Sequence, residues 1–104
     1  MIILKTVRRE IRNSSQNTNK MPDKPLVSII IVDYKENNPY LLESLDKISN
    51  QTYENYEVIL VNDFKTNLKF KNLITKSYNK IVGPAIKRDD GAKIAKGEIV
   101  CFLD

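Results

Sequence analysis

The sequence contains no histidine and no tryptophan, and its one cysteine is Cys101. The absence of histidine excludes histidine-based acid–base catalysis and histidine-ligated metal sites. A lone cysteine makes no intramolecular disulfide and no zinc site, so we interpret Cys101 as a thiol in the core. No apolar run approaches the ~20 residues that a membrane-spanning helix needs. At 104 residues the chain is one small domain or part of a larger one.

Charge is distributed unevenly along the chain. Residues 1–24 hold six basic and two acidic side chains, a net charge of +4, whereas residues 25–104 hold eleven of each kind. The excess of basic over acidic residues therefore lies entirely in the N-terminal leader and not in the domain. A domain without net charge argues against nucleic acid as a partner.

The start of the leader has the pattern of an amphipathic helix. Its apolar residues share one helical face, with the basic residues largely off it: Ile3, Leu4, Val7 and Ile11. One interpretation is peripheral contact of residues 1–12 with an anionic membrane surface, at the inner face of the membrane of a cytoplasmic protein. The favoured alternative is a frayed tail or a helix that packs on something absent, because so short a helix is marginal alone.

The rest of the leader predicts a domain boundary. Residues 13–20 hold no apolar side chain, and prolines at 22 and 25 follow them. We therefore predict a leader and flexible linker over residues 1–24 and an ordered domain over residues 25–104.

Within the domain, apolar runs alternate with helical patterns. Strands buried on both faces are predicted at 27–32, 56–61 and 98–103. Prolines in the first turn predict helices that begin near Pro39 and Pro84, the second running to about Lys96 with Gly97 as its stop. Residues 68–78 fit helical and strand spacing about equally. The alternation predicts an α/β fold, an open and mostly parallel sheet with flanking helices and right-handed crossovers.

All three predicted strands end at or next to carboxylates: Asp33 follows Val32, Asp63 comes after Val61-Asn62, and Asp104 follows Leu103. In an open parallel sheet the ligand crevice lies outside the carboxyl ends of the strands. Three acids at such ends indicate a site for a cation and a polar ligand. The alternative for each is an acid that is simply solvated at a strand end.

Several segments, in their order and spacing, resemble family 2 glycosyltransferases over about residues 26–104. They are Val27–Ile31, Leu42–Leu45, Asn50–Tyr53, Glu57–Asp63, Gly83–Ala85, Lys87–Asp89, Ala95–Glu98 and Phe102–Asp104. The resemblance implies a Rossmann-like GT-A fold, of which the chain looks like the truncated N-terminal, nucleotide-sugar-binding half. It also implies that Leu73–Thr75 lies on or near the third strand.

The resemblance carries site roles onto individual residues. Val32, Asp33 and Tyr34 match the segment that wraps the base and ribose, although Val32 replaces the usual proline there. Asp63 looks like the acid that binds the uracil edge, a task suited to an acceptor-only carboxylate. Arg88 resembles a group that approaches the diphosphate, to which a guanidinium is suited.

Asp104 resembles the first carboxylate of the Asp-x-Asp motif, which holds Mn²⁺ or Mg²⁺ against the nucleotide diphosphate. By the same resemblance, the second acid and the catalytic base would lie beyond residue 104, so the chain alone is expected to contain no catalytic residue and to be inactive. The implied function is donor binding, to a UDP-sugar or another nucleotide sugar, for metal-dependent glycosyl transfer to an unknown glycan, lipid or protein acceptor.

Two further alternatives stay open on the sequence. One is a non-catalytic nucleotide- or partner-binding α/β module left by truncation, and the other is a structural remnant that binds nothing. In the expected strand order, one edge of the strand at 98–103 has no partner within the chain. An unpaired apolar edge of this kind predicts association between molecules.

Overall fold

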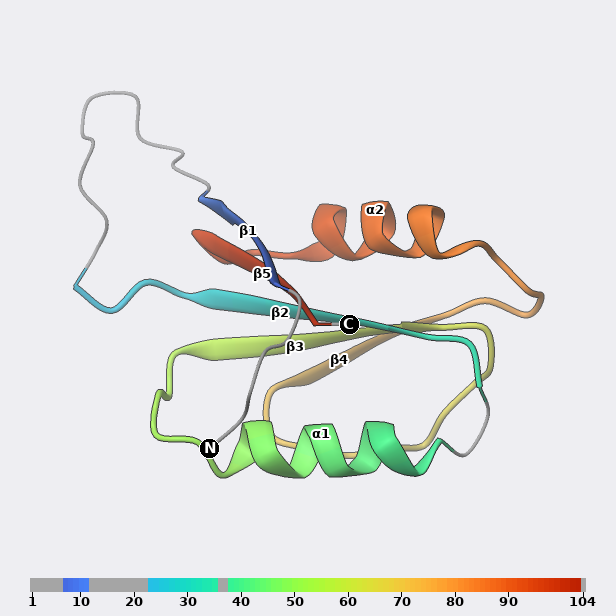
Figure 1. The fold of residues 1–104 in the computed structure, drawn as a ribbon, viewed down its shortest axis with the longest axis horizontal. Coiled ribbons are helices and arrows are strands. Elements are labelled where there is room, and N and C mark those ends of the chain that lie inside the picture. The colour runs from blue at the N-terminus through green and yellow to red at the C-terminus, as the bar shows by residue number, and fades with distance from the viewer. Residues whose placement is uncertain (1–6, 12–22, 36–37, 104) are drawn as a thin grey trace.

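The structure is a computed structural model, and it describes residues 7–11, 23–35 and 38–103. Five strands and two helices follow one another along the chain (Figure 1). The strands are β1 (Val7–Ile11), β2 (Val27–Asp33), β3 (Tyr56–Asn62), β4 (Leu73–Ser77) and β5 (Ile99–Leu103). The helices are α1 (Pro39–Ser49) and α2 (Pro84–Ile94).

The strands form a single five-stranded sheet in the order β1-β5-β2-β3-β4. Strands β5, β2, β3 and β4 are mutually parallel, and β1 runs antiparallel to β5. The predicted open, mostly parallel α/β sheet with flanking helices is thus confirmed. Because β2, β3 and β4 run in one direction, their carboxyl ends lie at one edge of the sheet, where a ligand crevice is expected.

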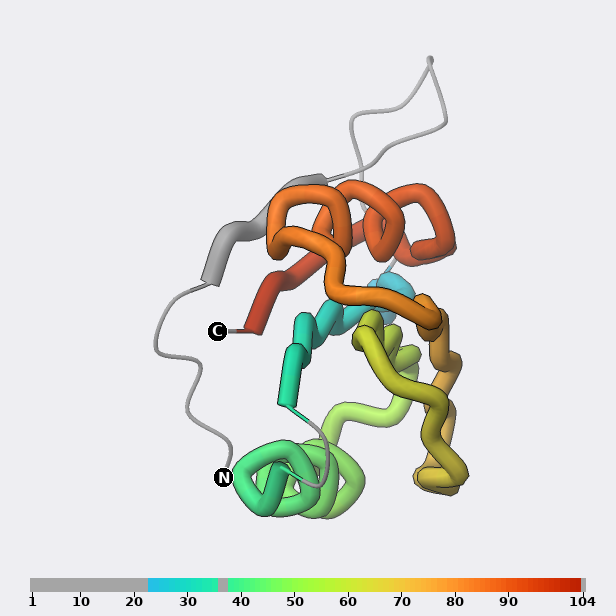
Figure 2. The backbone as a smooth tube through the Cα atoms, turned by 90° about the vertical axis from the view of Figure 1, so that its right-hand side faces the viewer, coloured from blue at the N-terminus to red at the C-terminus, as the bar shows by residue number. Residues whose placement is uncertain are grey.

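The helices cover opposite faces of the sheet, with α1 on one side and α2 on the other (Figure 2). Alternate residues of β2 serve the two layers: Ile29 and Ile31 pack in the cluster that includes Leu45 of α1, whereas Ile30 packs in the cluster on the α2 side. This two-sided burial is the reason that the strand sequence is continuously apolar.

Both helices begin where a proline predicts them. Asn38 caps α1, and its side chain accepts a hydrogen bond from the backbone N–H of Tyr40 at 3.0 Å. Helix α2 begins at Pro84, but it ends at Ile94, two residues before the predicted end, and Gly97 does not have the positive φ of a C-terminal stop. Gly97 instead lies in close contact with β2, a role that its lack of a Cβ permits.

Two ambiguous stretches of the sequence form strands. The resemblance placed Leu73–Thr75 on or near a strand, and β4 confirms it. The helical pattern of the leader is wrong for Val7–Ile11, which form β1, while Ile3 and Leu4 lie outside the described residues. Strand β1 pairs with β5 from Val7 opposite Leu103 to Ile11 opposite Ile99. The edge of β5 that was expected to be unpaired is therefore occupied.

None of the helices among the described residues is long and apolar enough to cross a membrane.

Candidate functional site at the carboxyl edge of the sheet

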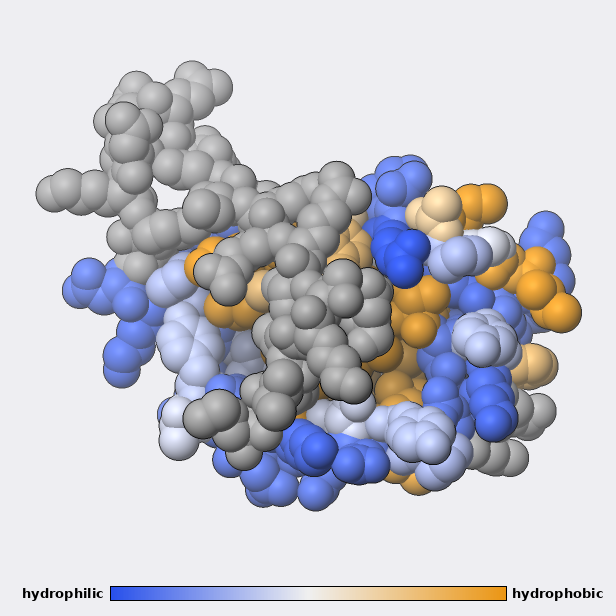
Figure 3. Space-filling view, in the orientation of Figure 1, coloured by the Kyte–Doolittle hydropathy of each residue, from blue (hydrophilic) through white to orange (hydrophobic). Residues whose placement is uncertain are grey.

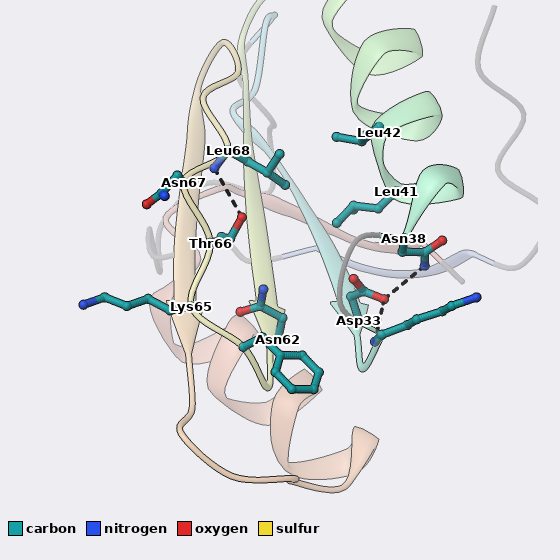
Figure 4. A pocket seen from close by; sticks show the side chains of 11 residues that line it. Asp33, Asn38, Leu41, Leu42, Asn62, Lys65, Thr66, Asn67 and Leu68 are labelled. Carbon is teal, nitrogen blue, oxygen red and sulfur yellow. Dashed lines mark hydrogen bonds between the residues drawn. The ribbon is translucent and has the colours of Figure 1, made fainter.

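A pocket of about 390 Å³ opens where β2 and β3 end, between the start of α1 and the loop that follows β3 (Figure 4). Its walls combine apolar side chains with amides, one carboxylate and two lysines. The lining residues are Asp33, Lys35, Asn38, Leu41, Leu42, Asn62, Phe64, Lys65, Thr66, Asn67 and Leu68. A concave site with apolar walls and a few convergent polar groups is the usual form of a small-molecule site.

Asp33 joins the end of β2 to the start of α1. Its side chain is buried, and its Oδ1 accepts hydrogen bonds from Asn38 Nδ2 at 3.1 Å and from the backbone N–H of Lys35 at 3.3 Å. Because Asn38 also caps α1, the carboxylate and the helix start are fixed relative to each other. Among the described residues both bonds go to Oδ1, so Oδ2 keeps acceptor capacity for a ligand.

Asn62, the last residue of β3, forms the other side of the pocket floor. It is buried, and its Oδ1 accepts a hydrogen bond from Ser77 Oγ at 2.6 Å, which ties the ends of β3 and β4 together. The next residues, 63–72, leave the sheet and return to β4, and five of them line the pocket. The site therefore has a rigid floor at the strand ends and one wall made of loop.

Asp63, one residue beyond β3, lies in a different environment. Its Oδ2 accepts a hydrogen bond from Lys87 Nζ at 2.8 Å, and its Oδ1 accepts one from the backbone N–H of Val82 at 3.0 Å. Both side chains of the ion pair are 1% exposed. The hydrogen bond from Lys87 lowers the pKa of the Asp63 carboxyl, helped by the Val82 N–H and the lysine charge and opposed by burial.

The ion pair connects three segments of the chain: the end of β3, the loop before α2 and the first turns of α2 itself. Asp63 faces this buried contact and lines a neighbouring pocket of about 260 Å³ instead of the main one. Each carboxylate oxygen has two lone pairs, so the bonds from Lys87 and Val82 leave room for a further donor. Recognition of a base by Asp63 stays a prediction.

The structure brings some of the predicted site residues together and separates others. Asp33 lines the main pocket, and Val32 and Asp33 both line an adjacent one of about 170 Å³. Tyr34 projects into solvent at 76% exposure and does not line the main pocket, and neither does Arg88, which is half-buried on α2. Asp104 lies outside the described residues.

Sequence reasoning missed Asn38, Asn62 and Lys87. Asn38 directly precedes the predicted helix start at Pro39, and Asn62 directly follows the strand predicted at 56–61. Both positions therefore indicate residues at the carboxyl edge of the sheet, where the pocket lies. Lysines are usually exposed, yet Lys87 is buried together with Gly91, one helical turn further on. A glycine in mid-helix marks a close approach to the sheet, and the residue four positions before it shares that face.

The described residues do not form a metal site by themselves. They contain no group of three histidine, cysteine, aspartate or glutamate side chains placed to hold an ion. Asp63 is occupied by Lys87, and Asp33 stands alone at the pocket. A divalent cation at this edge would therefore need ligands outside the described residues, of which Asp104 is the candidate.

The fold is of the α/β, Rossmann-like class, with a pocket at the carboxyl edge of its sheet. More specifically, the chain belongs to glycosyl transferase family 2, whose family model matches residues 28–104.

Curated relatives agree with this membership. The chain is 32% identical over 93 residues to the uncharacterized glycosyltransferase MJ1057 of Methanocaldococcus jannaschii, a match that covers 79% of this chain and 32% of that protein. It is 37% identical over 91 residues to the poly(ribitol-phosphate) beta-glucosyltransferase of Bacillus spizizenii, covering 75% of this chain and 14% of that protein.

The name of a third relative states its sugar donor. The UDP-Glc:alpha-D-GlcNAc-diphosphoundecaprenol beta-1,3-glucosyltransferase WfaP of Escherichia coli is 33% identical over 87 residues, covering 76% of this chain and 34% of that protein. The chain thus spans about a third or less of the length of these relatives. No solved structure gave a significant match.

Proposed function

We propose that this chain is the donor-binding part of a glycosyltransferase and that it holds the nucleotide of a UDP-sugar in the pocket between α1 and the loop after β3. The observation that carries the proposal is the position of this pocket at the carboxyl ends of β2 and β3, in a chain of glycosyl transferase family 2. UDP is favoured over other nucleotides because the name of the relative WfaP specifies UDP-Glc as its donor.

The lining suits the parts of a nucleoside diphosphate. Leu41, Leu68 and Phe64 offer apolar surface for a flat base. Asp33 and Asn62 supply acceptors and an amide for its polar edge or for ribose hydroxyls. The exposed ammonium groups of Lys35 and Lys65 suit the diphosphate. Arg88 does not line this pocket, and it belongs to the proposal only as a further cation for the diphosphate, while Val32 and Tyr34 contribute backbone around the base.

Transfer itself requires more than the described residues provide. A Mn²⁺ or Mg²⁺ ion held in part by Asp104 would neutralise charge on the diphosphate leaving group. In the proposed arrangement this chain's own residues bind and orient the donor, and the acceptor, whether glycan, lipid or protein, is met by other parts of the enzyme. Residues 1–104 alone are expected to give no glycosylated product.

Titration of the chain with UDP tests the proposal. The expected result is weak binding that tightens with Mn²⁺ and exceeds the binding of ADP. Asp33→Asn keeps the side-chain volume and the oxygen that Lys35 and Asn38 contact, but removes the charge offered to the ligand. Loss of a hydrogen bond to a charged group predicts at least roughly tenfold weaker UDP binding. Asp46→Asn, an exposed change on α1, is the matched control.

A second variant pair examines Asp63. Asp63→Asn alone leaves a buried lysine unpaired, so it confounds folding with recognition. The double variant Asp63→Asn with Lys87→Met removes both buried charges together. If Asp63 also recognises the base, the double variant binds UDP more weakly than the wild-type chain, at a temperature where thermal unfolding shows both proteins to be folded. Equal UDP affinity of Asp33→Asn and Asp46→Asn, in contrast, would contradict the proposed pocket.

The non-catalytic alternative shares the pocket and differs in consequence. Both functions predict UDP binding that tightens with Mn²⁺, because the ion neutralises the diphosphate charge whether or not a sugar is transferred. A glycosyl-transfer assay on a longer protein that continues past residue 104 would separate the two functions.

A further inference from the structure

Basic side chains are concentrated in one segment of the domain. From residue 64 to residue 88 the sequence holds seven lysine or arginine residues and no aspartate or glutamate. The remainder of residues 25–104 holds four basic and eleven acidic residues. The zero net charge of the domain therefore conceals a strong separation of charge, with the basic part in the loops and strand around β4.

The five lysines of this segment that precede α2 are all exposed, and we call them the lysine edge: Lys65, Lys69, Lys71, Lys76 and Lys80. These lysines lie on β4, which is the edge strand of the sheet, and on the loops before and after it. The three segments run together along one side of the molecule (Figure 2). None of the five forms an ion pair with another described residue. Lys76 Nζ lies over the ring of Tyr78, 5.4 Å from the ring centroid.

Exposed isoleucines accompany the lysines. Ile81 is 86% exposed, Ile86 is 55% exposed and Ile74 is 37% exposed. Ile74 lies on the same side of the β4 segment as Tyr78, whose hydroxyl meets Asp90 of α2, and Ile86 precedes Asp90 by one helical turn. The space-filling view shows hydrophobic and hydrophilic residues interspersed at this end of the molecule, where the loop before α2 lies (Figure 3).

We propose that the lysine edge, with Ile74, Ile81 and Ile86, docks the domain on an anionic phospholipid bilayer. Lysines on an edge strand also discourage pairing between sheets, and that role alone would explain the cations. It does not explain isoleucines left in water beside them. A bilayer interface accommodates both kinds of side chain, because anionic headgroups attract the ammonium groups and the headgroup–acyl boundary takes the apolar ones.

Charges that face the surface from α2 do not cancel the lysine edge. Asp89 and Asp90 are the α2 carboxylates next to this surface: Asp89 is exposed, and Asp90 Oδ2 accepts a hydrogen bond from the Tyr78 hydroxyl. Two carboxylates against five lysines leave the surface with a net positive charge. Two members of the edge also reach the sites: Lys65 lines the main pocket, and both Lys65 and Lys80 line the pocket beside it. Docking through this edge would therefore bring the mouth of the candidate donor pocket next to the membrane. The inference itself does not depend on glycosyl transfer.

Vesicle binding of the full chain tests the inference. The probes are vesicles of phosphatidylcholine alone and of phosphatidylcholine with phosphatidylglycerol, and the readout is the bound fraction after sedimentation. We expect binding only to the anionic vesicles and its loss at high salt. Each lysine near an anionic surface contributes about fivefold in affinity, so Lys71→Glu with Lys76→Glu should weaken binding at least about 25-fold.

The matched control is Lys93→Glu with Lys96→Glu, which changes the net charge equally at exposed positions towards the other end of α2. It should retain most of the binding, and any contribution of residues 1–12 is common to both variants. Ile81→Ser should weaken the binding that persists at moderate salt. Equal losses in the two double variants, or no vesicle binding by the wild-type chain, would overturn the inference. So would tight binding to inorganic polyphosphate that Ile81→Ser leaves unchanged, since that outcome identifies a soluble polyanion as the partner.

Discussion

Gly97 is the position at which one added methyl group should have the largest effect on stability. An alanine Cβ there would lie 2.6 Å from the Leu26 carbonyl oxygen, 2.6 Å from Ser28 Oγ and 2.8 Å from the Ser28 backbone nitrogen. Two of these three atoms belong to the backbone at the start of β2, which pairs with β3 and β5. The strand cannot give way, so the loop that carries Gly97 must move.

That movement would break a buried polar network. Ser28 Oγ donates to Glu57 Oε2 at 2.6 Å and accepts from the Gly97 N–H at 2.8 Å, and the Lys96 N–H donates to the same Glu57 oxygen at 2.7 Å. Overpacking costs about 1–3 kcal/mol, and each buried group left without its partner costs a further ~1–3 kcal/mol. The smaller conformational entropy of the unfolded alanine variant offsets ~0.4–1 kcal/mol.

We therefore expect Gly97→Ala to lower the free energy of unfolding by about 3 kcal/mol, which is roughly 12–24 °C in Tm for a domain of this size. Thermal unfolding followed by circular dichroism, with urea unfolding for the free energy, measures it. Gly83→Ala is the control, because a Cβ there meets nothing within 4 Å and the residue has φ −64°. A Tm for Gly97→Ala within about 3 °C of the control would refute the proposed packing of the α2–β5 loop.

Three other predictions concern stability and association. Tyr56→Phe should raise the free energy of unfolding by about 1 kcal/mol in urea titrations, because the buried Tyr56 hydroxyl has no hydrogen-bond partner among the described residues, and an unchanged or lower value would contradict this. The pKa of Asp63 is lowered in the folded state, so its contribution to stability is complete above the ordinary pKa of an aspartate and is lost as the pH falls through the folded value. The double variant Asp63→Asn with Lys87→Met should therefore lose less of its free energy of unfolding than the wild type when the pH is lowered. An equal loss in the two proteins would exclude the ion pair as the cause. Deletion of residues 1–22 should expose the edge of β5 and produce concentration-dependent oligomers in sedimentation velocity, whereas a monomer with an unchanged Tm would show that β1 contributes nothing.

The central fold could be predicted from sequence because its signals are local. A run such as Val27–Val32 specifies a strand covered on both faces, and Pro39 specifies where the next helix begins. The position of Asp33 followed from the same reasoning, since a residue directly after a parallel strand must lie at the carboxyl edge. These inferences need no knowledge of distant contacts.

The parts that could not be predicted depend on contacts between distant residues. Strand β1 gains its conformation by pairing Val7–Ile11 with Ile99–Leu103, some ninety positions away, and its short sequence fits a helical face equally well. Lysines are almost always exposed, so the burial of Lys87 follows only from the acid that meets it. The wall at 63–72 is loop, without a periodic pattern to read.

Polar side chains at the two ends of the sheet have different roles. At the amino ends of β2 and β3, Ser28 and Glu57 hold the loop that contains Gly97 through buried hydrogen bonds, and neither residue lines one of the pockets described above. At the carboxyl ends, Asp33 and Asn62 are each fixed on one oxygen and keep further hydrogen-bonding capacity towards the pocket. Substitutions at the first end should act through stability alone, whereas conservative ones at the second should change affinity with little effect on folding. That contrast, measured on the same chain, distinguishes a ligand site from an ordinary strand end.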